Sequence, residues 1–187
     1  MVGLLEMEKK HRKNIRIVVN GSESTGKTTL ARELSQHYNC IWIPEFARTY
    51  IERLNVQYTY NDVCAIQKKQ QMEILEFESQ KSGMAFWDTD LIITKIWFSE
   101  VYKKLPENTD NFIRTHQPDI YLVCDTDLPW VYDQVRENPT RREYLNNLYI
   151  HEIEAIGTPF FLVSGTGHKR TENAIHFIEK FLAETKH

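Results

Sequence analysis

The segment from Gly21 to Thr29, GSESTGKTT, constrains the fold of this chain more than any other feature. It matches the pattern G-x-x-x-x-G-K-[ST], it follows the β-branched run Ile15–Val19, and it leads into a helical pattern. Glycines at these positions permit a tight turn that points backbone N–H groups inward, at the positive end of the next helix. We therefore predict a phosphate-binding loop rather than a chance glycine turn. It comprises Gly21, Ser22, Glu23, Ser24, Thr25, Gly26, Lys27, Thr28 and Thr29.

Two side chains of this loop have a specific chemistry. Lys27 brings a full positive charge close to the β- and γ-phosphates, and the Thr28 hydroxyl is an oxygen ligand of the kind that Mg²⁺ prefers. The predicted cofactors are therefore ATP and Mg²⁺. No N-K-x-D motif, which would read guanine, follows the fourth or the fifth expected strand, and this favours ATP over GTP.

Short apolar runs alternate with helical patterns along the chain. The expected strands are 15–19, 41–43, 84–87, 120–124 and 160–163, and the expected helices are 26–38, 46–54, 62–81, 92–104, 129–136, 142–156 and 170–183. Continuous apolar strands are typical of a parallel sheet buried on both faces. We predict an α/β, three-layer P-loop NTPase fold with a five-stranded parallel sheet. Asp62 is expected to cap the helix that it begins, and Gly83 to end that helix.

Length and composition limit the domain organisation and the partners. A chain of 187 residues suits one domain, with residues 1–14 as a lead-in and residues 15–187 as the kinase-like domain. With 23 basic and 26 acidic residues, the net charge of −3 gives no general attraction to nucleic acid. No run approaches 18 apolar residues, so no membrane span is expected. The three cysteines are widely spaced and lack a CxxC pattern, which indicates free thiols in a reducing, cytoplasmic setting.

Ligands of parallel α/β sheets bind at the carboxyl ends of the strands, so the residues that directly follow each strand are candidates. Asp88 follows the third expected strand, where a carboxylate can hold Mg²⁺ directly or through water. Asp90 lies two residues on, where it can face a substrate. The alternative is that both carboxylates cap the next helix.

The second expected strand leads into Glu45 and Arg48, which lie one helical turn apart. A carboxylate here can accept the proton of a substrate hydroxyl, and the arginine can hold a hydroxyl or a phosphate. The alternative is a glutamate that balances the helix dipole, followed by a surface arginine.

Three arginines flank a proline-containing turn after the fourth expected strand, namely Arg136, Arg141 and Arg142. Their donors suit a mobile lid that stabilises charge on the phosphoryl group, with Arg142 on the ATP phosphates. An exposed, charged helix-turn-helix would have the same pattern. The glycine-containing loop that begins at Ser164 follows the fifth expected strand, where it can pack against the adenine or form an ordinary turn.

Two tryptophans lie beside these candidates, Trp87 before Asp88 and Trp130 after the fourth expected strand. A flat heteroaromatic substrate can stack on such rings. For any single aromatic residue, packing in the core is the more common role.

Five segments together resemble the ribosylnicotinamide kinase domain of bacterial NadR-type proteins: GSESTGKTT, PEFARTYIERL, FWDTDLIITK, DLPWVYDQVR and RREYLNNL. The resemblance extends from about Ile15 to His168. It implies a fold of the nucleoside and nucleotide kinase type. It also implies phosphorylation of the 5′-hydroxyl of nicotinamide riboside by ATP·Mg²⁺, which gives nicotinamide mononucleotide. The PEFAR segment is also similar to deoxynucleoside kinases, in which the matching glutamate is the proposed base.

On this resemblance, the catalytic candidates are Lys27, Glu45, Asp88, Arg136 and Arg141. NadR-type proteins usually carry an adenylyltransferase domain before the kinase, whereas here the kinase-like region begins almost at once, so no NAD-forming activity is expected. Two alternatives stay open: a kinase for another nucleoside, and a regulatory nucleotide-binding ATPase without a small-molecule acceptor. No pattern in the sequence predicts an oligomeric state.

Overall fold

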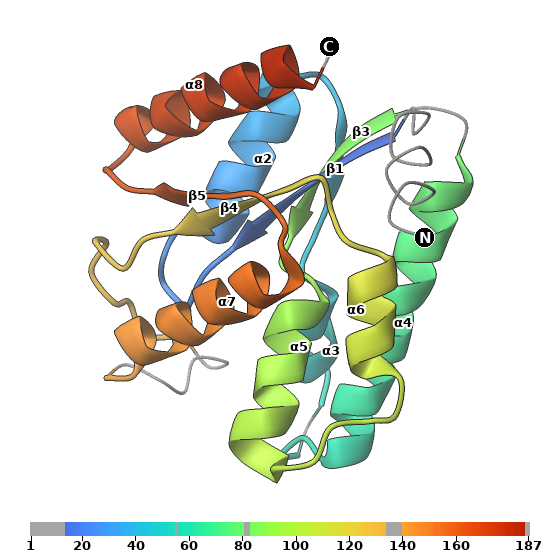
Figure 1. Cartoon of the computed structure of the whole chain (residues 1–187). Helices are drawn as coiled ribbons and strands as arrows, with labels where there is room; N and C mark the ends of the chain where they lie inside the picture. Colours follow the sequence, from blue (N-terminus) through green and yellow to red (C-terminus); the bar gives the residue numbers. More distant parts are fainter. Residues whose placement is uncertain (1–13, 55, 81–82, 134–139, 186–187) are drawn as a thin grey trace.

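The sheet of this protein is parallel and has five strands. The computed structural model describes residues 14–54, 56–80, 83–133 and 140–185 (Figure 1). The strands are β1 (Asn14–Asn20), β2 (Ile41–Ile43), β3 (Gly83–Asp88), β4 (Ile120–Cys124) and β5 (Phe160–Val163). Their order in the sheet is β2-β3-β1-β4-β5, and every neighbouring pair is parallel. All five carboxyl ends therefore meet at one edge, and β1 lies at the centre.

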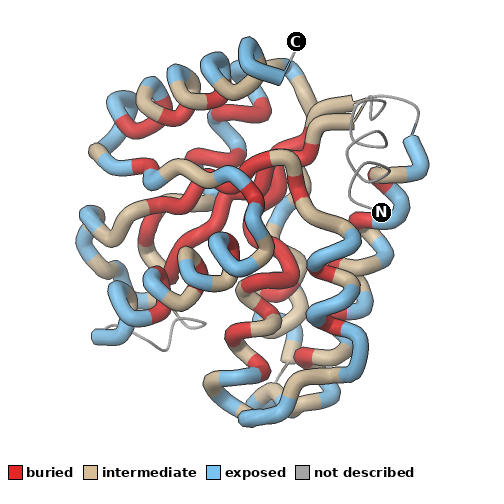
Figure 2. Tube along the Cα trace, viewed as in Figure 1, coloured by how far each residue is buried: buried red, intermediate tan, exposed pale blue. Residues whose placement is uncertain are grey.

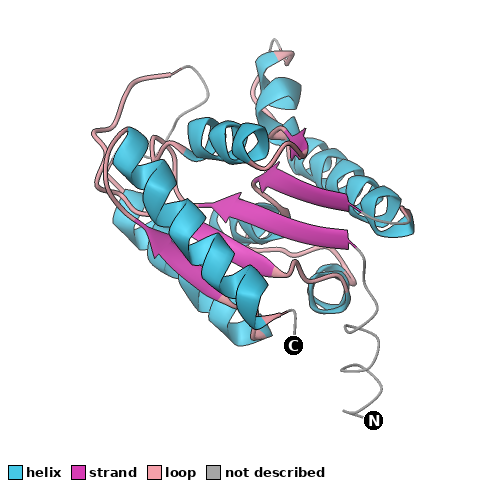
Figure 3. Ribbon diagram, turned by 90° about the horizontal axis from the view of Figure 1, so that it is seen from above, coloured by secondary structure: helices cyan, strands magenta, loops and turns pink. Residues whose placement is uncertain are grey.

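Helices cover both faces of the sheet and make three layers (Figures 1 and 3). On one face lie α2 (Lys27–His37) and α8 (His168–Glu184). The other face carries the longer set of helices, beside which α3 (Phe46–Glu52) lies. That set is α4 (Tyr60–Ser79), α5 (Leu91–Trp97), which runs into the π-helical turn η1 (Phe98–Tyr102), α6 (Thr109–Thr115) and α7 (Arg142–Ile156).

Each face of the sheet has its own hydrophobic core, and the buried residues concentrate along the strands (Figure 2). Ile17 and Val19 of β1 pack with Leu34 of α2 and Ile178 of α8. Val18, which points to the opposite face, belongs to the core formed with α4 to α7. Because β4 is buried on both faces, its sequence IYLVC is apolar throughout. β1 is apolar from Ile17 to Val19, and it also carries the buried Arg16.

The expected strands agree with the structure to within one residue at each end. The bounds of β2, β4, β5 and α7 are those expected. Two expectations at α4 were wrong. Its N-cap is Thr59, which forms a capping box with Asp62, so Asp62 lies inside the first turn. The helix already ends at Ser79, and Gly83 opens β3 instead of closing α4.

The connection between β3 and α7 also differs from expectation. α6 was not expected, because seven residues give too little apolar periodicity to predict a helix. The helix expected over 129–136 is absent from 129–133, while 134–136 lie outside the described residues. Over the described part of the chain, no helix has the length and apolar character needed to cross a membrane.

Candidate active site

The predicted phosphate-binding loop connects the carboxyl end of β1 to the start of α2, and its backbone is tightly folded. Gly21 has φ 138°, and a Cβ there would lie only 2.9 Å from the carbonyl oxygen of Cys124. Gly26 has φ 78° and is the N-cap of α2. Inside the loop, the Thr25 hydroxyl donates to Ser22 O over 2.7 Å, and Lys27 Nζ donates to the same oxygen over 2.9 Å. Glycine is thus required at Gly21 by sterics, and Lys27 is held over the loop.

Two side chains of α7 hold this loop from outside. Arg142 donates from Nε to Glu23 O over 3.0 Å and from a terminal nitrogen to Ser24 O over 3.2 Å. Asn146 accepts from Ser22 N over 3.1 Å and donates to Cys124 O over 3.3 Å. Asn146 was not among the predicted site residues, although its i,i+4 spacing from Arg142 places both side chains on one face of the helix.

Asp88 ends β3, which pairs with β1 so that Asp88 lies opposite Val19. Its side chain is buried, and neither carboxylate oxygen has a fully formed hydrogen bond within the described residues. Burial raises the pKa of this carboxyl, against the opposing effect of the Lys27 ammonium and the nearby Thr28 hydroxyl. A buried carboxylate without a partner, next to a hydroxyl and a phosphate-binding loop, suits a hydrated Mg²⁺. Thr28 and Asp88 are the residues that would hold the ion, with phosphate oxygens and water as the other ligands.

No group of three or more His, Cys, Asp or Glu side chains with metal-binding geometry occurs in the part of the chain that the structure describes. This is compatible with Mg²⁺, which usually keeps several waters and needs only one or two protein ligands in nucleotide sites.

Asp90 has a structural role in this site. It accepts from Ile92 N over 3.0 Å and so caps α5, and its second oxygen accepts a hydrogen bond from the Tyr121 hydroxyl. The structure thus shows the capping role, and because Asp90 also lines the pocket beside Asp88, a contact with a substrate stays a prediction.

Trp87 is 2% exposed and belongs to the core, where Phe77 packs edge-on against it and the Arg16 guanidinium lies over its ring. Core packing is thus its observed role, but Trp87 also lines the small pocket beside Asp88, so stacking of a substrate base on it stays a prediction. At the end of a strand buried on both faces, packing inside the protein determines its surroundings.

A small pocket lies beside Asp88, on the side away from β1. It is lined by the end of β2 with Pro44, by the first residue of α3, by Gln70 and Glu73 of α4, and by residues 87–90, which end β3 and follow it. Because the pocket shares Asp88 with the phosphate-binding side, a molecule bound here would face the nucleotide phosphates. The pocket and the phosphate-binding loop thus both adjoin the end of β3 at Asp88.

Glu45 directly precedes α3 and Arg48 lies in its first turn, next to Pro44 and Phe46, which line the pocket. Glu45 is the N-cap residue of α3 by position, but its side chain makes no capping hydrogen bond, so its carboxylate is directed elsewhere. Arg48 pairs with Glu52 over 2.9 Å and with Asp133 of the loop after β4. The hydrogen bond that Arg48 donates to the Asp133 carboxylate is the main reason why the pKa of Arg48 is raised. The positive charge of Arg48 is one of the effects that oppose the rise in the pKa of Asp88.

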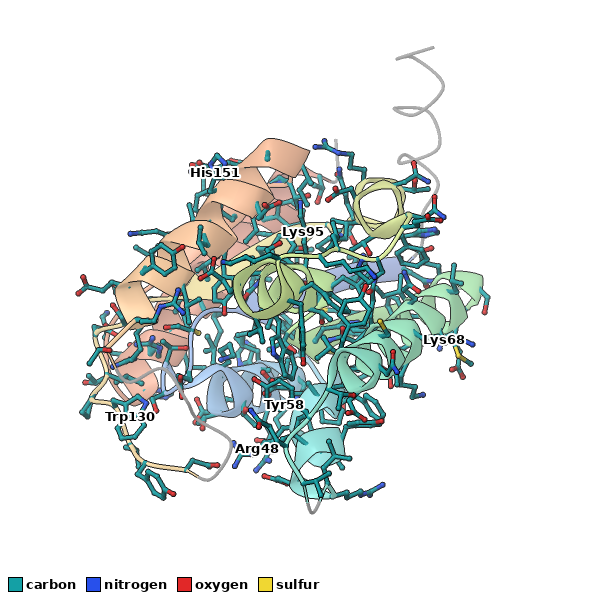
Figure 4. The ribbon with its side chains drawn as sticks, turned by 90° about the horizontal axis from the view of Figure 1, so that it is seen from below. Arg48, Tyr58, Lys68, Lys95, Trp130 and His151 are labelled. Carbon is teal, nitrogen blue, oxygen red and sulfur yellow. The ribbon has the colours of Figure 1, made fainter. Side chains whose placement is uncertain are left out.

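The loop after β4 reaches back over the phosphate-binding loop. Trp130 Nε1 donates to Glu23 over 3.5 Å, and the Ser24 hydroxyl exchanges hydrogen bonds of 3.2 Å with the backbone of Val131. Figure 4 shows Trp130 and Arg48 on the same side of the molecule. Trp130 is half-buried here, next to the nucleotide side of the site.

The lid arginines are only partly described. Arg136 lies outside the described residues. Arg141 forms an ion pair with Glu100 of the π-helical turn and stacks over Tyr144. Arg142 contacts the phosphate-binding loop itself. The structure therefore brings Arg142 to the predicted site and holds Arg141 against η1.

The loop after β5 is fixed by a buried arginine that sequence reasoning missed. Arg170 bonds Asp127, the carbonyl oxygen of Gly165, Thr25 O at 3.0 Å and Asp125 O at 2.9 Å. It thereby joins the loops after β4 and β5 to the phosphate-binding loop. An arginine in the first turn of an amphipathic helix carries no sequence signal that would distinguish it from a surface residue.

A parallel sheet of order β2-β3-β1-β4-β5, with a phosphate-binding loop after its central strand and helices on both faces, defines a P-loop domain of the nucleoside and nucleotide kinase type. This is the fold class expected from the sequence.

The chain matches the model of a family described as AAA domain over residues 16–170, and it belongs to that family. It is similar to the trifunctional NAD biosynthesis/regulator protein NadR of Escherichia coli, with 22% identity over 179 residues, which are 91% of this chain and 43% of NadR. NadR of Salmonella typhimurium is 22% identical over 177 residues, 90% of this chain and 43% of that protein. The chain thus spans somewhat less than half the length of these relatives, and the resemblance to NadR-type proteins is confirmed.

Solved structures show the same fold. A NadR structure in complex with NR superposes with a TM-score of 0.73 at 23% identity, covering 92% of this chain and 52% of that one. A NadR structure with NAD and AMP-PNP gives a TM-score of 0.71 at 23% identity, with 92% and 50% covered. Deoxyadenosine kinase from M. mycoides gives 0.64 at 14% identity, with 89% of this chain and all 100% of that chain covered.

Proposed function

We propose that this protein is an ATP·Mg²⁺-dependent nucleoside kinase that phosphorylates the 5′-hydroxyl of nicotinamide riboside and so gives nicotinamide mononucleotide. The observation that carries the proposal is the buried, unpartnered Asp88 carboxylate between the phosphate-binding loop and a separate pocket. A protein that only binds or hydrolyses ATP needs no second pocket at this point.

Different residues of the site would have different roles in phosphoryl transfer. The backbone N–H groups of the phosphate-binding loop and the Lys27 ammonium hold the β- and γ-phosphates. Thr28 and Asp88 hold Mg²⁺, which neutralises phosphate charge when bound. The bond from the γ-phosphorus to the bridging β-oxygen breaks as a bond to the substrate O5′ forms, and the hydroxyl proton passes to a carboxylate. Glu45 is our first candidate for that base, and Asp88 is the second.

The acceptor is proposed from the relatives. NadR, a protein of NAD biosynthesis, has been solved with NR bound, and this chain matches it over 92% of its own length. At 23% identity the likeness extends to the fold, so the choice of nicotinamide riboside is an inference from it. The similarity to a deoxyadenosine kinase keeps another nucleoside as the alternative acceptor. A regulatory ATPase remains the alternative of a different class.

The test is ADP release from ATP·Mg²⁺ with nicotinamide riboside and the common nucleosides as acceptors. We expect strong stimulation by nicotinamide riboside, with its loss in Lys27→Ala and Glu45→Gln. Lys68→Ala, an exposed residue of α4, is the matched control and should behave like the unmodified protein. Stimulation by a different nucleoside would change the acceptor and keep the mechanism. ATP binding without stimulation by any acceptor would refute the kinase and favour the regulatory ATPase.

A further inference from the structure

We propose that Thr89 binds the acceptor: its hydroxyl hydrogen-bonds a sugar hydroxyl of the nucleoside in the pocket beside Asp88. This inference rests on the proposed function and assigns a residue that determines how the acceptor is held. It comes from an unusual backbone conformation at one position of the site.

Thr89 has φ 71°, in the left-handed region that L-residues rarely adopt. For a β-branched residue this conformation is a genuine outlier, and such outliers persist only where the surroundings impose them. At Thr89, contacts of its own backbone N–H and of the following residue impose the conformation. Thr89 N donates to Val19 O over 3.0 Å, at the end of the strand that leads into the phosphate-binding loop, and the next residue, Asp90, is fixed as the cap of α5.

A glycine would make the same turn without the steric cost of a branched side chain. The turn alone therefore does not account for a threonine. The side chain is 4% exposed and lines the pocket beside Asp88, so it does not serve as a solvated surface group either. Among the described residues no hydrogen bond to its hydroxyl is found, and the hydroxyl oxygen is not one of the fully buried side-chain atoms that lack a partner, so it is open to a molecule in the pocket. A ligand in the pocket would supply a hydrogen-bond partner.

The position of Thr89 indicates which part of a nucleoside it would meet. It directly follows Asp88, which lies opposite Val19 of β1, the strand that leads into the phosphate-binding loop. A group bound at Thr89 is thus close to the phosphates, where the sugar that receives the phosphoryl group must lie. Carboxylates such as Asp88 and Glu73, which line the same pocket, only accept hydrogen bonds when ionised. The Thr89 hydroxyl can donate as well as accept, which matches the hydroxyls of a sugar.

The experiment compares three substitutions that separate the hydroxyl from the backbone. Thr89→Val keeps the shape, the β-branching and the conformational cost but removes the hydroxyl. Loss of one hydrogen bond should lower kcat/KM for the nucleoside roughly 10-fold, with KM for ATP and the melting temperature unchanged. Thr89→Ser keeps the hydroxyl and should recover most of that loss.

Thr89→Gly relieves the backbone and removes the hydroxyl. We expect its melting temperature to rise by about 2–4 °C while acceptor kcat/KM falls as in Thr89→Val. The matched control is Lys103→Gly, because Lys103 has φ 51° in an exposed position after η1. It should gain melting temperature without any change in turnover.

The outcomes distinguish this inference from the proposed function. Normal acceptor kinetics in Thr89→Val, with nucleoside turnover intact, would overturn the role of Thr89 alone. Equal losses in Thr89→Ser and Thr89→Val would also overturn it, because the hydroxyl would then make no difference. A complete lack of nucleoside turnover in the unmodified protein would refute the proposed function and this inference with it.

Discussion

Arg170 allows a prediction whose magnitude can be worked from its contacts. Its side chain is 5% exposed, and it makes an ion pair of 2.6 Å with Asp127 in addition to hydrogen bonds to the carbonyl oxygens of Thr25, Asp125 and Gly165. Arg170→Met keeps much of the buried stem but leaves those four partners without their donor. Removing one member of a buried ion pair costs about 3–5 kcal/mol. Because Asp127 is 29% exposed and can recover water, we expect the lower end, about 3 kcal/mol.

The assay is urea unfolding at neutral pH, together with KM for ATP. KM should rise, because Arg170 joins the loops after β4 and β5 to the phosphate-binding loop. Arg170→Lys should recover only part of the stability, since an ammonium lacks the planar fork of five donors. Lys169→Met, in the same helical turn and 72% exposed, is the control and should change little. A loss of unfolding free energy below about 1 kcal/mol in Arg170→Met would contradict this prediction, because the four partners would then have found other donors.

The ion pair between Arg170 and Asp127 should also make the stability of the protein depend on pH. Burial acts to raise the pKa of Asp127, but the hydrogen bonds from Arg170 and from Gly165 N outweigh it, so the pKa is lowered. A lowered pKa in the folded state adds stability above the unfolded value of about 3.9, and this contribution is lost as the pH falls through the folded value. Stability of the unmodified protein should therefore decline below about pH 4 more steeply than that of Arg170→Met.

Three further substitutions test separate parts of the structure by urea unfolding. Gly21→Ala should lower the free energy of unfolding by more than about 2 kcal/mol and abolish ATP binding, because the new Cβ would lie 2.9 Å from a carbonyl oxygen. Gly157→Ala should cost only about 1 kcal/mol, because Gly157 has φ 75° but no atom within 4 Å of the added Cβ. Equal costs would contradict the steric reading. Thr59→Ala removes the cap of α4 and should cost about 1 kcal/mol, and no loss would mean that the cap is redundant. Tyr121→Phe deprives the buried Asp90 of a donor and should cost about 1–3 kcal/mol, while an unchanged midpoint would contradict that bond.

The sheet could be predicted from the sequence because its strands are buried on both faces. Ile17, Val18 and Val19 are all fully buried, so the sequence must be continuously apolar there, and such runs bounded by polar residues define strand ends closely. The phosphate-binding loop could be predicted for a related reason, since its glycines are needed at positions where a side chain would clash or where φ is positive. Gly21 is fixed by the close approach of Cys124 O.

Other features depend on contacts between residues far apart in the chain, and no local pattern encodes those. Trp87 follows an apolar strand and precedes a candidate carboxylate, yet its surroundings are set by Phe77 and Arg16 from other elements. Arg170 and Asn146 contact the phosphate-binding loop across 145 and 124 positions of sequence, respectively. The cap of α4 was misassigned for a local reason: Thr59 and Asp62 are both capping residue types, and only the backbone direction decides between them.

The D-T-D segment shows how one backbone angle separates two roles that the sequence leaves equivalent. In a continuous strand, residues two apart point to the same face, so Asp88 and Asp90 would share one environment. The left-handed conformation of Thr89 interrupts the strand between them. Asp90 therefore turns into the core, where both of its oxygens are used by α5 and Tyr121. Asp88 stays without a partner opposite the phosphate-binding loop, which is the condition that a ligand for Mg²⁺ must meet.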